Sequence, residues 1–209
     1  MKKKLLLAMV SIMIASLFLA ACSSGDEETK GKSGESGDKK DTLVYGRGGD
    51  STSLDPITTT EGESYKVTIN VFETLLTYGE QDTTLHPGLA EKWTPSEDGL
   101  KYTLKLREDV KFHDGTDFNA EAVVFNFERW MNGNEEQFPY YTMFGGYKGD
   151  EGHVIKEVKA TDEYTVEFTL KRPQAPFLKN LAMSSFGIAS PTALKEQGDE
   201  NFSKNPVGT

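Results

Sequence analysis

The stretch GLAEKWTPSEDGLKYTLKLREDVKFHDGTDFNAEAVVF, residues 88–125, carries the pattern that decides the fold. After the turn signal Asp98-Gly99, apolar and polar residues alternate with a period of two over residues 100–107. Such alternation is typical of a strand with one buried and one exposed face. Asn119 then stands in the position of a helix N-cap, and apolar residues recur at helical spacing as far as Met131. We therefore expect a strand over 100–107 and a helix over 119–131.

Outward from this stretch, the sequence predicts further strands and helices. Residues 164–171 alternate in the same way, and with the preceding run 154–160 they predict an antiparallel hairpin. Residues 43–46 read as a short strand, and residues 64–78 have the spacing of a helix. The aromatic, glycine-rich run 138–149 is expected to be a loop. The fold class is mixed, α/β to α+β.

Composition limits the possible partners. The chain has 209 residues, of which 36% are hydrophobic, enough for a folded body of one or two domains. Its net charge is −10, and without residues 1–21 it becomes −13, from 20 basic and 33 acidic residues. A chain this acidic lacks the basic face that nucleic acid requires. One cysteine excludes an internal disulfide, and three scattered histidines give no metal-ligand spacing, so we expect no metal and no cofactor.

The N-terminal segment has the order of a bacterial export signal. Three lysines are followed by an apolar run that ends in small residues, so residues 1–21 are expected to be a signal peptide. Leu19-Ala20-Ala21-Cys22 resembles a lipobox, which predicts that Cys22 is lipid-modified. The alternatives are a transmembrane helix, for which the run is marginally short, and an ordinary signal peptide with a chance cysteine. Residues 22–41 are then expected to be a disordered Ser/Gly/charged tether.

Several motifs follow one another in a fixed order through the folded part of the chain. They are S-L-D-P (53–56), A-E-K-W (90–93), D-G-L (98–100), K-F-H-D-G (111–115), A-E-A-V (120–123), P-Q-A-P-F (173–177) and N-P-V-G-T (205–209). This order resembles the family 5 extracellular solute-binding proteins, the peptide and nickel binders of ABC transporters, and it covers residues 42–209. The resemblance implies a type II periplasmic-binding-protein-like fold of which this chain holds the first lobe only, with the second lobe missing. The chain departs from the family at Ala122, where the family usually has aspartate.

The resemblance also implies where a ligand is contacted: by the segment after S-L-D-P, and by aromatic side chains of facing loops. The candidate ligand-binding residues are Thr60, Glu61, Gly62 and Glu63 in that segment, with Trp130, Tyr140 and Tyr141 as a pocket wall. The segment is expected to offer backbone amides to a ligand carboxylate; the alternative is a solvated loop with a helix cap. For the aromatic residues the alternative is packing beneath a loop. His113 and Asp114 lie in a turn signal, and with no G-x-S-x-G or H-E-x-x-H motif we expect no catalytic residues and no enzyme.

Together these features predict the substrate-binding component of a peptide ABC importer. Its partners are expected to be a peptide ligand, ABC permease subunits and the membrane, through the lipid at Cys22. The expected location is the extracellular face of a Gram-positive type cell membrane. Two alternatives stay open: a nickel or metallophore receptor of the same family, and a peptide-sensing surface lipoprotein without a transport role.

Overall fold

The alternating runs of the sequence are the strands of one antiparallel sheet. In the computed structural model, which describes residues 43–209, the sheet order is β3-β4-β6-β5. Its strands are β3 (Ala90–Pro95), β4 (Lys101–Leu106), β5 (Ile155–Asp162) and β6 (Thr165–Leu170). Tyr102 faces Phe168 and Leu104 faces Val166 across the β4–β6 pair, and all four side chains are buried. The predicted strand and the predicted hairpin are confirmed, because their apolar positions share one buried face.

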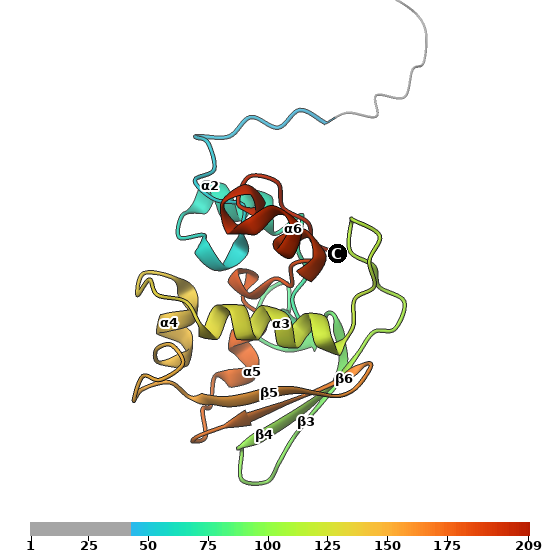
Figure 1. Cartoon of the computed structure of the whole chain (residues 1–209), viewed down its shortest axis with the longest axis vertical. Helices are drawn as coiled ribbons and strands as arrows, with labels where there is room; N and C mark the ends of the chain where they lie inside the picture. The colour runs from blue at the N-terminus through green and yellow to red at the C-terminus, as the bar shows by residue number, and fades with distance from the viewer. Residues whose placement is uncertain (1–42) are drawn as a thin grey trace, which may run out of the picture. The chain divides into compact units, whose positions relative to one another are not determined.

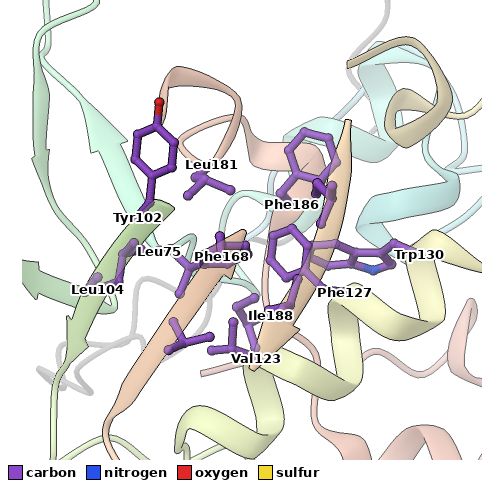
Figure 2. Close-up of a cluster of buried hydrophobic side chains, with 14 of the residues drawn as sticks. Leu75, Tyr102, Leu104, Val123, Phe127, Trp130, Phe168, Leu181, Phe186 and Ile188 are labelled. Atoms are coloured by element: carbon purple, nitrogen blue, oxygen red, sulfur yellow. The ribbon is translucent and has the colours of Figure 1, made fainter. Parts of the chain in front are cut away.

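Helix α3 (Ala120–Met131) lies across that buried face (Figure 1). Its N-cap is the predicted one, since the side-chain oxygen of Asn119 accepts the N–H of Ala122 at 3.0 Å. The Phe127 ring lies 4.8 Å from the Phe168 ring in an edge-to-face arrangement, the packing that aromatic pairs prefer. Figure 2 shows this cluster between the helix and the strands. The predicted helix over 119–131 is confirmed.

The remaining elements surround this sheet and helix. They are η2 (Pro56–Thr58), α2 (Gly62–Thr68), β1 (Leu76–Tyr78), β2 (Leu85–Pro87), α4 (Pro139–Phe144), α5 (Phe177–Asn180), η3 (Ser184–Phe186) and α6 (Pro191–Phe202). In Figure 1, α2 and α6 lie on the side of α3 that faces away from the sheet, and α4 lies beside one end of α3. Within residues 43–209, none of the helices has the length and apolar character needed to span a bilayer.

The helix predicted over 64–78 is shorter than expected. Helix α2 ends at Thr68, and residues 76–78 form strand β1 instead. The carbonyls of Thr74 and Leu75 accept the N–H groups of Leu89 and Ala90, each at 2.9 Å. Pairing with a distant segment therefore overrides the helical spacing of the apolar residues, as tertiary context commonly overrides local propensity.

Two other predictions were wrong. Residues 43–46 contain no strand, and the side chains of Leu43, Val44 and Tyr45 are exposed. The predicted loop over 138–149 contains helix α4, which begins at Pro139 and ends before Gly145 with its φ of 72°. Proline at the first helical position and glycine just past the last one are ordinary helix boundaries. The compact unit formed by Gly46–Thr209 contains all the elements above.

Polar bonds attach the segment before α6 to the rest of the unit. The Asn126 side chain donates to the carbonyl of Ala189 at 2.8 Å and accepts its N–H at 3.1 Å. The Asp114 carboxylate accepts the hydroxyl of Ser190 and the N–H of Thr116. Asp114 is thus a turn residue, as predicted. The backbone N–H of the neighbouring His113 donates to the distant carbonyl of Gly208 at 2.8 Å.

Candidate functional site

The segment after S-L-D-P is held by two carboxylate caps. Asp55 caps η2, and Glu61 caps α2 by accepting the N–H groups of Glu63 at 2.6 Å and Ser64 at 2.9 Å. The Ser64 hydroxyl and these amides stabilise the charged form and lower the pKa of Glu61 to about 2. The amides that were expected to receive a ligand carboxylate are therefore already bound to a carboxylate of the chain itself.

The other candidate residues of this segment differ in accessibility. Thr60 and Gly62 are exposed. The Glu63 carboxylate pairs with Lys66 at 2.6 Å, while the Glu63 carbonyl accepts a guanidinium N–H of Arg47 at 2.8 Å. Thr60 and Gly62 are thus the members of the segment whose surface is open to a ligand.

Trp130 and Tyr140 come together at a hollow of about 280 Å³, which we name the aromatic hollow. Its wall consists of Ile57, Trp130, Phe138, Tyr140 and Tyr147, and its polar rim includes Thr58, Arg129, Asn132, Asn134 and Asp199. Trp130 and Tyr140 are almost fully buried, so they pack in the core and form the floor of the hollow at the same time. Tyr141 is not part of this wall; its ring packs 5.4 Å from that of Tyr147.

An ion-pair cluster closes one side of the aromatic hollow. The Arg129 guanidinium bonds both carboxylate oxygens of Asp55 and, through Nε at 3.0 Å, the carboxylate of Asp199. The side chains of Asp55 and Arg129 are 3% and 17% exposed, whereas that of Asp199 is 76% exposed. Burial disfavours the charged guanidinium, but the hydrogen bonds and charge of the two carboxylates outweigh it and raise the pKa of Arg129. One cation between two carboxylates leaves the rim with a net negative charge.

This arrangement provides binding chemistry. Buried aromatic faces offer apolar contact area, and the amide, hydroxyl and charged groups of the rim can orient a polar ligand. Among residues 43–209, no three His, Cys, Asp or Glu side chains lie close enough together to hold a metal ion. Cys22, the predicted lipidation site, lies outside the described residues, as do the signal peptide and tether predicted over residues 1–41.

The sequence reasoning missed the polar half of the hollow. Arg129 carried a weak signal, since it directly precedes the candidate Trp130 at the end of a predicted helix. Its partners Asp55 and Asp199 are separated from it by 74 and 70 positions, and no local pattern relates them. Phe138 and Tyr147 belong to the aromatic run that was expected to be a loop. The sequence showed that this run is aromatic, but not that these two rings line the hollow.

Comparison with known proteins gives the family. A family model described as "Bacterial extracellular solute-binding proteins, family 5 Middle" matches residues 84–209. The chain belongs to this family. Its members are solute-binding proteins and not enzymes, and they act in the extracellular or periplasmic space.

Several relatives of this family member are known by name. The dipeptide-binding protein of Escherichia coli (strain K12) is 40% identical over 184 residues, which cover 80% of this chain and 34% of the relative. Heme-binding protein A of Haemophilus influenzae is 33% identical over 222 residues, covering 97% of this chain and 40% of the relative. The chain thus spans between a third and two fifths of the length of these relatives.

Solved structures confirm the predicted fold class. The periplasmic binding protein DppA from Helicobacter pylori, in complex with the peptide STSA, is 37% identical with a TM-score of 0.66. The match covers 77% of this chain and 34% of that chain. A dipeptide-binding protein from Pseudoalteromonas sp. SM9913, in complex with Met-Leu, gives 27% identity and a TM-score of 0.66, over 76% and 34% of the two chains. The fold is the type II periplasmic-binding-protein-like one, and the chain corresponds to part of it.

Proposed function

We propose that this chain is part of the receptor of a peptide ABC importer, which captures di- or oligopeptides and delivers them to the permease. The observation that carries the proposal is the 40% identity with a dipeptide-binding protein over 80% of this chain. The peptide-bound structures with the same fold, from Helicobacter pylori and Pseudoalteromonas, support it.

The candidate site agrees with this ligand class. The aromatic hollow offers a side chain of the peptide an apolar floor, and the net negative rim favours an amine over a carboxylate. The open residues Thr60 and Gly62 offer backbone groups that recognise a peptide regardless of its side chains. In the two-lobed receptor, a peptide held from both sides stabilises the closed form, the general mechanism of hinge closure around a ligand.

The ligand class can be tested by thermal shift and calorimetry on the full-length receptor. We expect dipeptides and short oligopeptides to raise the melting temperature, and Phe138→Ala to weaken their binding, because this half-buried ring lines the hollow. Thr142→Ala, at an exposed position of helix α4, whose N-cap is Phe138, is the control and should bind like the wild type.

A heme or metallophore ligand is the competing outcome of the same assay. Heme-binding protein A is a relative over nearly the whole chain, and NikA from Brucella suis in complex with Fe(III)-EDTA shares the fold with 29% identity and a TM-score of 0.58. Stabilisation by heme or a nickel chelate, with no stabilisation by any peptide, would overturn the peptide proposal and leave the family membership intact.

We further propose that Cys22 carries a lipid that holds the receptor on the outer face of a Gram-positive type membrane. The support is Leu19-Ala20-Ala21-Cys22 after a basic and then apolar segment. A bound lipid keeps the receptor close to its permease and raises the effective concentration there. Cys22→Ser should abolish labelling by radioactive palmitate, while Ser23→Ala should keep it; labelling that persists in the cysteine variant would disprove the anchor.

A surface lipoprotein that senses peptides without transporting them would share this ligand and this anchor. Uptake of a labelled peptide by cells separates the two roles. We expect uptake to disappear when the receptor gene is deleted and to return when it is restored. Unchanged uptake in the deletion strain would favour sensing.

A further inference from the structure

His153, just before strand β5, is a buried imidazole with one nitrogen unpaired. The residue is 1% exposed. Its Nε2 lies 2.9 Å from the hydroxyl oxygen of Tyr140, whereas its Nδ1 is buried without a hydrogen-bond partner among the described residues. Buried polar atoms in native proteins nearly always have a partner, so an orphan nitrogen calls for an explanation.

The Tyr140–His153 pair determines which nitrogen carries the proton. Burial raises the pKa of the Tyr140 hydroxyl, and burial together with the charge of Lys171 lowers the pKa of His153 to about 4, so both groups are neutral at pH 7. If the hydroxyl donates to Nε2, only the Nδ1–H is left unpaired. If Nε2–H donates instead, both the hydroxyl proton and the Nδ1 lone pair are left unpaired. The first arrangement leaves fewer groups unsatisfied and is favoured. Nδ1 is then a donor that lacks an acceptor.

His153 lines a hollow of about 520 Å³ between the end of α3 and strand β5, which we name the lysine hollow. Its charged members are Lys148, Lys156, Lys171, Glu128 and Glu157. Backbone hydrogen bonds fix the main chain of two of these lysines. The backbone N–H of Lys171 donates to the carbonyl of Val154, and that of Lys148 donates to the carbonyl of Met131, both at 2.8 Å. None of the three lysines takes part in an ion pair with another described residue.

We propose that the lysine hollow binds an oxyanion of the phosphate class, with Lys148 and Lys171 supplying charge and the Nδ1–H of His153 a directed hydrogen bond. A metal cation would need the lone pair of Nδ1 and would be repelled by the lysines. An oxyanion accepts from all three groups, and charge-assisted bonds of this kind are the stronger ones. Since Nδ1 has no contact with solvent, the exposed side chains around it must shift on binding, and no ion pair within residues 43–209 restrains the lysines.

The test is a titration of the full chain with inorganic phosphate at pH 7, against chloride at equal ionic strength. The ring nitrogens of His153 are followed by ¹H–¹⁵N NMR. We expect a saturable shift of Nδ1, and binding weaker by about tenfold or more in the double variant Lys148→Met/Lys171→Met, which keeps the apolar stems but loses two charges. Lys159→Met, on strand β5 but not among the residues that line the hollow, is the control and should leave the affinity unchanged. A phosphate shift that persists in the double variant would overturn the proposal, and a shift equal to that in chloride would exclude a free anion as the ligand.

The phosphate group has two possible sources, a free anion or a lipid headgroup. Cosedimentation of the Cys22→Ser chain with phosphatidylglycerol and with phosphatidylcholine vesicles distinguishes them. The lysine variants are made in the same Cys22→Ser chain, so any vesicle binding by the N-terminal segment is equal with and without the lysines. A lysine-dependent preference for phosphatidylglycerol without binding of free phosphate assigns the site to a headgroup. Binding of free phosphate without that preference assigns it to a soluble anion. Absence of both disproves the oxyanion site.

Discussion

Helix α3 separates two layers that are attached to it by different means (Figure 1). On the sheet side the contact is apolar, and the rings of Phe127 and Phe168 meet at 4.8 Å. On the side of α2 and α6, a small apolar cluster around Phe72 and Phe202 is supplemented by polar bonds from α3, made by Asn126 and Arg129. Apolar contact tolerates many partners of similar shape, whereas each polar bond requires a particular partner. The stability of the sheet side should therefore fall most when side-chain volume is removed, and that of the α2 and α6 side when a hydrogen-bond or ion-pair partner is removed.

The largest effect is expected from Phe127→Ala. The side chain is fully buried between helix and sheet, so its removal loses apolar contact and leaves a cavity, at a cost of about 3–5 kcal/mol in the free energy of unfolding. Urea unfolding measures the change. Phe125→Ala is the matched control, because this half-buried ring of the same helix faces the α6 side. Equal losses for the two variants would contradict the proposed difference between the layers.

The second-largest effect is expected from breaking the ion pair between Asp55 and Arg129. Asp55→Asn removes the charge of an almost completely buried carboxylate and leaves Arg129 with only the exposed Asp199, which should cost about 3 kcal/mol. Asp199→Asn breaks the exposed contact with the same guanidinium and should cost about 1 kcal/mol or less. Urea unfolding of both variants gives the comparison, and equal costs would show that burial of the pair is not what matters.

The same contrast explains what could be predicted from the sequence. Residues 100–107, 119–131 and 154–171 show their periods within a dozen positions, and their strands and helix were predicted correctly. Strand β1 was misread as helix because its residues pair with those of β2, a contact that no local period reveals. Helix α4 was missed although Pro139 and Gly145 mark its boundaries, because the aromatic composition of the run was given more weight.

The candidate site divides in the same way. Trp130 and Tyr140 were candidate pocket residues because of the family resemblance, and both line the aromatic hollow; that they contact a ligand stays a prediction. Arg129 and Asp199 were not identified, because their function depends on a cluster assembled from three distant segments. A helix cap was the alternative for the segment after S-L-D-P, but Glu61 was not identified as its residue. Glutamate is not among the preferred N-cap residues, yet its longer side chain reaches the amides of α2.

A third prediction tests this cap through pH. The folded pKa of Glu61 is about 2, below its ordinary value of 4.5, so its contribution to stability is complete above pH 4.5 and is lost as the pH falls toward 2. Glu61→Gln cannot ionise and should be less stable than the wild type at pH 7. The difference in melting temperature should shrink below pH 4.5 and vanish near pH 2. A difference that stays constant from pH 7 to pH 2, at fixed ionic strength, would exclude the charged cap as the cause.

The smallest effect is expected from adding a polar link on the α6 side of α3. The side-chain oxygen of Asn119 accepts the N–H of Ala122. An aspartate at position 122 can accept the backbone N–H of Asn119 in turn, as in a capping box. Ala122 lines a hollow of about 320 Å³ between α3 and α6 that also contains Lys195, so a carboxylate there has both space and a nearby cation.

Position 122 is 3% exposed, however, and desolvation of the new charge offsets part of the gain. We therefore expect Ala122→Asp to stabilise the chain by a few tenths to about 1 kcal/mol, measured as a higher melting temperature. Ala122→Asn, which can accept the same bond without the charge, separates capping from electrostatics. If both variants melt at or below the wild-type temperature, a buried polar group at this position costs more than its bonds return. On the α6 side of α3, a buried polar group would then be stabilising only where both its donor and its acceptor are paired, as in the side chain of Asn126 with Ala189.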